Sequence, residues 1–341
     1  GISDKYTAEY ILQYAEIIDY VYTGEAETVI PELFFAIQKN SKNTHFTGLC
    51  KQGMEMAMNE KLCYSENPDM EACYHHFLYK DMHAVFMEAS RGCVHQCIFC
   101  GLHRVPYRRK SPGEVVQQMK KLKDLYDVGF INFADNFFPM QGSWISEFLD
   151  ILKKAPLKIN WACLIRADRI DRDLIPELKN AGCTGIFMGV ESVSEETLIY
   201  MKKTKNPKKY IKCLNENILA FAEAGIHVKV STILGFPGET SQNMWETGRF
   251  VKQLKKQGID AYTGPLVVYP GSELWERYRK GDLILHQILN SSIRRNYPGL
   301  FHEKFPPEPL IAPNEFIPAN RNMDQKRLEK EIADILQFIE E

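Results

Sequence analysis

The chain has 341 residues, of which 45% are hydrophobic and 25% charged, and its formal net charge is -2. These values are ordinary for a globular protein, and the length suits one large α/β domain with appendages. A nearly neutral chain shows no electrostatic footprint for nucleic acid, so we interpret the basic runs at residues 108–110 and 202–205 as solvated faces. No apolar run approaches the roughly 18 residues of a membrane span. Nine cysteines, an odd number, favour a reducing compartment over a disulfide framework. We therefore expect a cytoplasmic protein that binds neither nucleic acid nor a membrane.

The N-terminal segment, residues 1–80, carries little regular pattern. A helix is expected over residues 8–16, a strand over residues 17–22, and a second helix over residues 28–38 with proline in its first turn. The strand, a glycine turn and the second helix would make one small α/β unit. Residues 41–80 are interpreted as irregular short strands and turns.

Residues 81–280 are regular, and apolar strands alternate with helices through this range. Strands are expected over residues 83–89, 130–134, 158–164, 184–190, 227–234 and 261–268. Helices are expected from Ser111 onward and over residues 143–153, 172–180, 208–224, 241–257 and 272–280. Such alternation predicts parallel strands joined by right-handed crossovers. Six units rather than eight predict an α/β fold built as a partial (β/α)6 TIM-like barrel.

A proline-rich C-terminal extension, residues 281–341, ends in a helix over residues 323–339. Ile332, Ile335 and Ile339 fall on one face of that helix, together with Leu336. We interpret the helix as a packing or lid element of the barrel, with a partner-binding helix as the alternative.

Three cysteines, Cys93, Cys97 and Cys100, lie within eight residues on the loop after the first barrel strand. Thiolates are soft ligands for zinc, copper(I) and iron-sulfur clusters, and three of them leave one iron of a 4Fe-4S cluster open to a substrate or cofactor. Gly92 and Gly101 flank the triplet and favour a compact loop. The alternatives are a core helix with three small buried side chains, or a closed zinc site that recruits a distant ligand.

With this cysteine spacing after the first of six strand-helix units, the sequence resembles the radical S-adenosylmethionine (SAM) superfamily, over roughly residues 80–280. The resemblance implies that Cys93, Cys97 and Cys100 hold a 4Fe-4S cluster and that SAM binds its open iron. It also implies that one-electron reduction cleaves SAM to methionine and a 5′-deoxyadenosyl radical, which abstracts a hydrogen atom from a small organic substrate. The electron would come from a reductant such as flavodoxin or ferredoxin.

The resemblance places further residues around SAM. Phe99, before the third cysteine, is expected to pack near the adenine. Asp135 and Asn136 end the second strand and are candidates for contacting the SAM amino group, with a plain strand-end turn as the alternative. Arg166 follows the third strand and is the expected partner of the SAM carboxylate, because a guanidinium fork matches a carboxylate at two points. Arg169 is its competitor.

The fourth strand ends in Gly-Val-Glu-Ser, which resembles the ribose motif of the family. The resemblance implies that Glu191 and Ser192 contact the ribose hydroxyls. A helix N-cap at Ser192 or Ser194 is the alternative interpretation.

After the fifth strand, Leu234, Gly235 and Phe236 begin a Leu-Gly-Phe-Pro-Gly-Glu-Thr segment that matches the family signature at this place. Glycine there would let the backbone approach the adenine closely. Glu239 is expected to cap the next helix rather than to react.

Residues 18–27 resemble the last strand and turn of the cobalamin-binding domain found in the B12-associated branch of the superfamily. The cobalt-ligand motif DxHxxG is absent, since Asp81 and His83 have the right spacing but no glycine follows. We therefore expect an enzyme that works without cobalamin. One alternative is a cobalamin-dependent radical SAM methyltransferase whose cobalamin domain is missing here or supplied separately. The other is a non-catalytic iron-sulfur or zinc scaffold.

Overall fold

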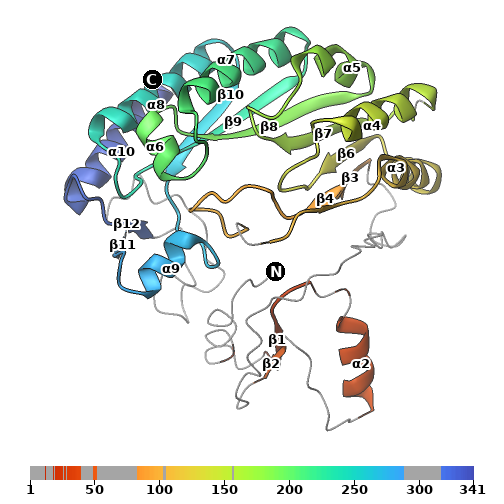
Figure 1. Cartoon of the computed structure of the whole chain (residues 1–341), viewed down its shortest axis with the longest axis horizontal. Helices are drawn as coiled ribbons and strands as arrows, with labels where there is room; N and C mark the ends of the chain where they lie inside the picture. The colour runs from red at the N-terminus through yellow and green to blue at the C-terminus, as the bar shows by residue number, and fades with distance from the viewer. Residues whose placement is uncertain are drawn as a thin grey trace.

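The computed structural model describes residues 12, 18, 20–25, 27, 29–39, 49–51, 83–102, 105–155, 157–287 and 316–341. At its centre lies a parallel sheet of six strands in the order β10-β9-β8-β7-β6-β3 (Figure 1). The strands are β3 (Ala84–Met87), β6 (Phe130–Phe133), β7 (Asn160–Ile165), β8 (Cys183–Glu191), β9 (His227–Leu234) and β10 (Asp260–Pro265). Each strand after β3 pairs with the barrel strand that precedes it in the sequence. The expected α/β fold with a partial TIM-like barrel is confirmed.

Helices lie between the strands and cover one face of the sheet, as Figure 1 shows for α4, α5 and α7. They are α3 (Pro112–Tyr126), α4 (Ser143–Lys154), α5 (Ile175–Asn180), α6 (Glu195–Tyr200), α7 (Pro207–Glu223), α8 (Ser241–Lys256) and α9 (Glu273–Arg279). On α4, Trp144, Phe148 and Leu152 recur every four residues and are buried against the sheet. The sequence pattern did not predict α6, a helix of six residues.

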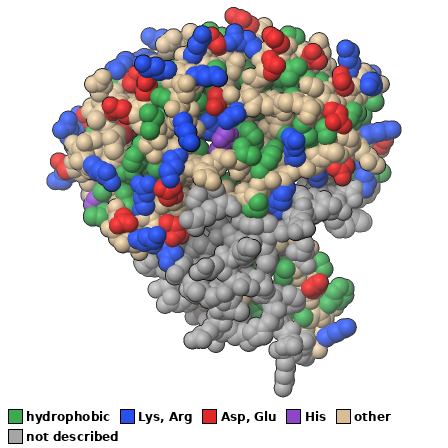
Figure 2. Space-filling model, in the orientation of Figure 1, with side chains coloured by type: hydrophobic (Ala, Val, Ile, Leu, Met, Phe, Trp, Pro, Cys, Tyr) green, Lys and Arg blue, Asp and Glu red, His purple; other side chains and the backbone are tan. Residues whose placement is uncertain are grey.

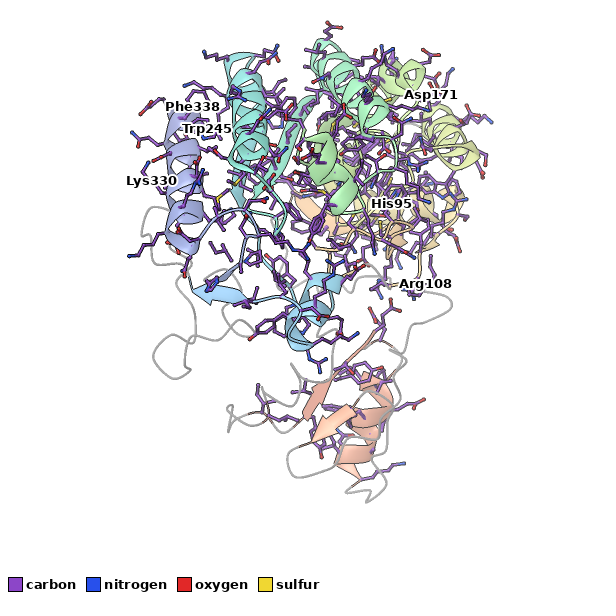
Figure 3. All side chains as sticks on the ribbon, turned by 60° about the vertical axis from the view of Figure 1, so that its left-hand side comes forward. His95, Arg108, Asp171, Trp245, Lys330 and Phe338 are labelled. Atoms are coloured by element: carbon purple, nitrogen blue, oxygen red, sulfur yellow. The ribbon has the colours of Figure 1, made fainter. Side chains whose placement is uncertain are left out.

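The last helix, α10 (Gln325–Glu340), packs against α8 and extends the barrel core. Ile332 and Ile335 are fully buried. Gly248 on α8 allows the approach, since a Cβ atom there would lie 2.6 Å from Cγ2 of Ile335. Figure 3 shows Trp245 and Phe338 between the two helices, and their ring centroids are 5.3 Å apart. The helix is thus a packing element, as expected.

A short hairpin, β11 (Leu285–Gln287) with β12 (Phe316–Pro318), comes before α10. In the N-terminal segment, β1 (Tyr20–Tyr22) pairs with β2 (Leu49–Lys51), and α2 (Ile30–Gln38) falls within the expected second helix. The helix expected over residues 8–16 and most of residues 41–80 lie outside the described residues. The domain boundaries at residues 80 and 280 stay predictions. Among the described helices, none has the length and hydrophobicity to cross a membrane.

Candidate functional site

The cysteine loop leaves the sheet through a narrow ribbon of two short strands, β4 (Ser90–Arg91) and β5 (Arg108–Arg109), which pair antiparallel. Gly92 opens the loop with φ at +75°, and a Cβ atom there would lie 2.3 Å from the carbonyl oxygen of Pro106. Only glycine fits this position. The backbone from Cys93 to Cys100 makes turns rather than a helix, so the core-helix alternative is wrong.

Ile98 fixes the middle of the cysteine loop to two other segments. Its N–H donates to the carbonyl oxygen of Met201 (3.1 Å), and its own carbonyl accepts from the N–H of Leu274 (3.0 Å). The side chain is fully buried in a second hydrophobic core made by loops and short helices at the carboxyl end of the sheet. This second core contains Ile98, Leu198, Met201, Tyr210, Phe236, Leu266, Val268, Leu274 and Trp275.

Two of the predicted adenine-site residues meet beside this core. The rings of Phe99 and Phe236 are arranged edge to face with centroids 5.8 Å apart. Phe99 comes from the cysteine loop and Phe236 from the turn after β9, so the fold unites residues that are far apart in the sequence.

The three loop cysteines are free thiols, with Cys97 buried and Cys93 and Cys100 partly buried. Burial raises the pKa of the Cys93 and Cys100 thiols. Within the described residues, no three His, Cys, Asp or Glu side chains converge on a point that could hold a single metal ion. A 4Fe-4S cluster needs a wider spacing, because each thiolate binds a different iron. Three free thiols spread over one fixed loop fit such a cluster.

Asp135 holds the start of the cysteine loop. Its buried carboxylate accepts from the N–H of Ala89 (3.0 Å) and from the hydroxyl of Ser90 (2.5 Å). Burial raises the pKa of Asp135 to about 7. Asn136, in contrast, is exposed at the end of the second barrel strand. The fold therefore gives these two neighbours different surroundings.

Arg166 is buried beside the cysteine loop. Its Nε and Nη2 donate to the carboxylate of Asp168 (2.9 and 3.1 Å), and Nη2 also donates to the carbonyl of Lys203 (2.7 Å). Its Nη1 is buried without a partner among the described residues. A buried, unpaired guanidinium donor suits an anionic ligand. The side chain of Arg169 is 46% exposed.

Glu191 and Lys203 form a buried ion pair at 2.9 Å. Burial by itself would lower the pKa of Lys203, but Glu191, together with the nearby Tyr210 and Cys97, outweighs it and raises that pKa. Glu191 has a left-handed backbone with φ at +69°, a conformation that is costly for a residue with a side chain. Gly189 gives it room, since a Cβ atom there would lie 2.5 Å from Oε1 of Glu191.

Two basic residues that we interpreted as solvated are not. Lys203 is buried, and it is close enough to Cys93, Cys97 and Cys100 to interact with them electrostatically. Arg108 is also largely buried, in an ion pair with an N-terminal carboxylate. No local pattern marks either residue, because their partners come from other parts of the chain.

Ser192 lies deep in the structure rather than on an open face. Its hydroxyl is 3.1 Å from that of Thr247 on α8, and it accepts from the N–H of Ser194 (3.1 Å). Ser194 is the N-cap of α6, and its hydroxyl accepts from the N–H of Thr197. The N-cap alternative is therefore confirmed at Ser194.

The turn after β9 is held by a buried glutamate. Glu239 accepts from the N–H groups of Gly235 (2.7 Å) and Phe236 (3.1 Å), and burial raises its pKa to about 7. Leu234 is fully buried, and a Cβ atom on Gly235 would lie 3.2 Å from Ile332 of α10.

The expectation that Glu239 caps the next helix is wrong. Thr240 and Asn243 form the capping box of α8 instead. Glu239 is directed to the preceding turn because the backbone N–H groups there are buried and need an acceptor.

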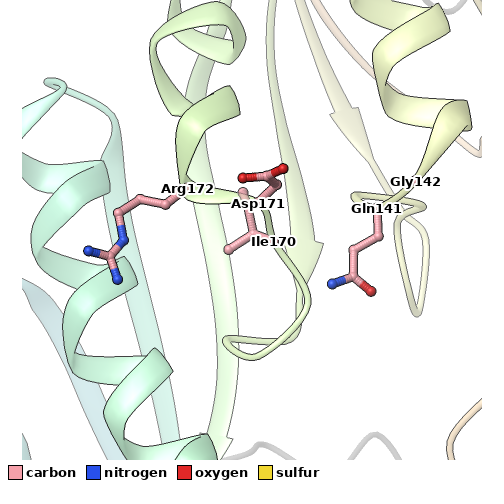
Figure 4. Close-up of a pocket in the computed structure, with 5 residues that line it drawn as sticks. All are labelled: Gln141, Gly142, Ile170, Asp171 and Arg172. Atoms are coloured by element: carbon pink, nitrogen blue, oxygen red, sulfur yellow. The ribbon is translucent and has the colours of Figure 1, made fainter.

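A shallow depression of about 650 Å³ lies on the same rim of the barrel. Figure 4 shows its lining, which comes from the β6-α4 loop and the segment after β7: Gln141, Gly142, Ile170, Asp171 and Arg172. None of the predicted SAM residues is among them. On the described surface in Figure 2, basic and acidic side chains are interspersed.

Comparison with known proteins shows what the chain is similar to. The model of the radical SAM superfamily matches residues 87–251. The fold is similar to that of the radical SAM methyltransferase TsrM from Kitasatospora setae, with a TM-score of 0.66, 16% identity, and coverage of 98% of this chain and 70% of that one. It is also similar to the cobalamin-dependent SAM radical enzyme OxsB, with a TM-score of 0.60, 15% identity, and coverage of 92% and 50%.

The chain is also similar to curated proteins. An uncharacterized methyltransferase from Pyrococcus horikoshii is 25% identical over 292 residues, which are 82% of this chain and 62% of that protein. The anaerobic magnesium-protoporphyrin IX monomethyl ester cyclase of Rubrivivax gelatinosus is 28% identical over 170 residues, 48% of this chain and 29% of that protein. The chain thus spans less than two thirds of these relatives. Residues 87–251 thus match the radical SAM superfamily, a family that implies a 4Fe-4S cluster and SAM.

Proposed function

We propose that this enzyme cleaves SAM reductively at a 4Fe-4S cluster held by Cys93, Cys97 and Cys100, and acts on a small organic substrate. The observation that carries the proposal is the set of three free thiols on one fixed loop beside a buried, incompletely paired arginine. When bound, the cluster and SAM supply one-electron cleavage to methionine and a 5′-deoxyadenosyl radical, which takes a hydrogen atom from the substrate. The electron would come from a flavodoxin or a ferredoxin.

The residues of the chain would bind and orient SAM. Nη1 of Arg166 is the donor offered to the SAM carboxylate, and Asp168 holds the guanidinium so that this nitrogen stays free. Asn136, exposed at the strand end, is the candidate for the amino group. Lys203 places a positive charge near Cys93 and Cys100, which partly offsets the effect of burial on the pKa of these two thiols.

The adenosine would lie along the turns at the carboxyl ends of β8 and β9. Phe99 and Phe236 offer ring surface for the adenine, and Leu234 and Gly235 offer backbone groups. Glu191 is assigned to the ribose. Ser192 has its hydroxyl engaged by Thr247 and Ser194, so in this proposal it supports the turn rather than contacting ribose.

The test is anaerobic reconstitution with iron and sulfide, reduction, and measurement of 5′-deoxyadenosine and methionine from SAM. Cys93→Ala is expected to lose bound iron and to reduce the product by more than about a hundredfold, because the cluster loses one of three ligands. Cys213→Ala, on the outer helix α7, is the matched control and is expected to keep both the bound iron and the formation of product. A Cys93→Ala protein that still forms 5′-deoxyadenosine would contradict the proposal. Transfer of deuterium from a labelled candidate substrate into 5′-deoxyadenosine would identify the substrate.

Cobalamin-dependent methyl transfer is a second candidate, and the names of the relatives favour it. The Pyrococcus horikoshii relative is named a methyltransferase, and TsrM is a radical SAM methyltransferase. This candidate competes with our expectation of an enzyme that works without cobalamin. A titration followed by visible absorption tests it, together with transfer of a deuterated methyl group from SAM in the presence of methylcobalamin. No binding and no methyl transfer by the full-length protein would exclude it.

A further inference from the structure

Two arginines face each other at the base of the cysteine loop. In the β4-β5 ribbon, Arg91 stands directly opposite Arg108. Their side chains are only 17% and 13% exposed, so water screens the two charges incompletely. Like charges directly opposite each other destabilise a strand pair. The ribbon therefore needs a negative partner to close.

Glu25, from the segment after β1, supplies that partner to both arginines. One carboxylate oxygen accepts from Nη1 of Arg108 at 2.7 Å, and the other lies 3.5 Å from Nη1 of Arg91 and also binds Nη2 of Arg108. The side chain of Glu25 is itself only 13% exposed. Figure 3 shows Arg108 on the edge of the barrel that faces β1, β2 and α2.

Glu25 differs from the other acidic partners of Arg91. Among the described residues, Arg91 also pairs with Glu27 (2.6 Å) and Glu88 (2.9 Å). Glu25 pairs with both arginines and so bridges the two strands.

The ribbon matters because it sets where the two ends of the cysteine loop meet. It consists of two residue pairs only, and the next contact along the loop is the close approach of Gly92 to Pro106. Cys93 follows directly after Gly92. Opening the ribbon would therefore move Cys93 relative to Cys97 and Cys100, which are anchored through Ile98.

We propose that Glu25 is a positioning residue for the cluster: by neutralising Arg91 and Arg108 together, it holds the β4-β5 ribbon at the base of the cysteine loop closed. The inference rests on the proposed function only in taking the three cysteines as cluster ligands. It predicts that Glu25 controls access to Cys93 before any cluster is inserted.

The test measures alkylation of each cysteine by iodoacetamide in the metal-free, full-length protein, with peptide mass spectrometry as the readout. Cys213 on α7 is the internal reference. Glu25→Gln is expected to speed labelling of Cys93 about fivefold relative to Cys213, the change that follows when about 1 kcal/mol of loop closure is lost. Glu25→Asp, which keeps the charge, should stay within about twofold of the unmodified protein. Glu32→Gln, an exposed carboxylate on α2, is the matched control.

A charge exchange separates this role from general destabilisation. Cys93 should be labelled faster in Glu25→Arg than in Glu25→Gln. Adding Arg108→Glu should restore slow labelling of Cys93, because the exchanged charges would again attract each other and the carboxylate would face Arg91. Equal labelling of Cys93 in Glu25→Gln and the unmodified protein would overturn the proposal, as would failure of the exchange to restore protection.

Iron release from the reconstituted protein to a chelator gives a second readout, and Glu25→Gln should accelerate it by a similar factor. Unchanged iron release would also count against the proposal. Because the labelling arm uses metal-free protein, a failure to cleave SAM would sink the proposed function and leave the result on Glu25 standing.

Discussion

Two kinds of buried carboxylate hold the loops at the carboxyl edge of the sheet. Glu239 accepts from backbone N–H groups and forms no ion pair within the described part of the chain, and burial raises its pKa to about 7. Glu191 is also buried but is paired with Lys203 at 2.9 Å. The first kind fixes the shape of a turn. The second kind brings a cation into the interior beside the cysteine loop.

The same contrast separates two aspartates. Asp135 is held by the N–H of Ala89 and the hydroxyl of Ser90 and has a raised pKa, with burial as the main cause. Burial would also raise the pKa of Asp168, but Arg166 more than offsets it and lowers that pKa. The ion-paired carboxylates Glu191 and Asp168 thus hold the cations Lys203 and Arg166 near the thiols. Glu239 and Asp135 instead fix the shapes of the loops.

Breaking the buried ion pair between Glu191 and Lys203 should have the largest effect on stability. Lys203→Met leaves Glu191 buried without its cation, which should cost about 3–5 kcal/mol in the free energy of unfolding. Urea unfolding of the metal-free protein at pH 8 measures it. Adding Glu191→Leu should recover much of the loss, because no buried charge is then left alone. A loss below about 1 kcal/mol would show that the pair is not buried as described.

Glu239 and Asp135 accept hydrogen bonds from backbone N–H groups and have raised pKa values. They should make stability depend on pH in the opposite sense to an ion-paired acid, whose pKa is lowered. In the folded protein Glu239 keeps its proton up to a pKa of about 7, whereas the unfolded chain releases it near the ordinary value. Between about pH 4.5 and pH 7 the unfolded state binds fewer protons, so stability falls as pH rises and is flat above this window. The loss is on the order of 3 kcal/mol.

Glu239→Gln should remove this part of the pH dependence, because an amide does not ionise in the window. The measurement is urea unfolding at half-unit steps from pH 4.5 to pH 8. Glu246→Gln, on the same α8, is the control and should keep the slope. If Glu239→Gln keeps the full slope, the ionisation assigned to Glu239 is wrong.

Removing the Ser90 hydroxyl, which donates to Asp135, should have a smaller effect on stability. Ser90→Ala removes the 2.5 Å hydrogen bond and should destabilise the protein by about 1–2 kcal/mol. Ser143→Ala, at the exposed start of α4, is the comparison and should change little. Thermal unfolding of the two variants side by side decides whether the contact stabilises the loop base.

A substitution at Lys202, the neighbour of Lys203, should have the smallest effect on stability. Lys202 is 53% exposed and pairs with Glu273 at 2.6 Å. Lys202→Met should change stability by less than about 1 kcal/mol, because water screens a surface pair. If Lys202→Met costs as much as Lys203→Met, burial does not distinguish the two lysines.

The sequence alone determined the repeating part of the fold and the place of the cysteines. Strand and helix periods are local, since a strand alternates every two residues and a helix every 3.6, and a glycine-flanked cysteine triplet is visible within ten residues. The six strands and the loop after the first of them therefore agree with expectation.

Only the tertiary structure decided what surrounds that loop. Glu25 and Arg108 are 83 residues apart, and Thr247 comes 55 residues after Ser192, so no local pattern connects them. Lys203 lies in a run of basic residues that looks solvated, and only the fold turns one of them inward to Glu191. Such pairings depend on how loops from different strand-helix units meet at one edge of the sheet, which spacing along the chain does not encode.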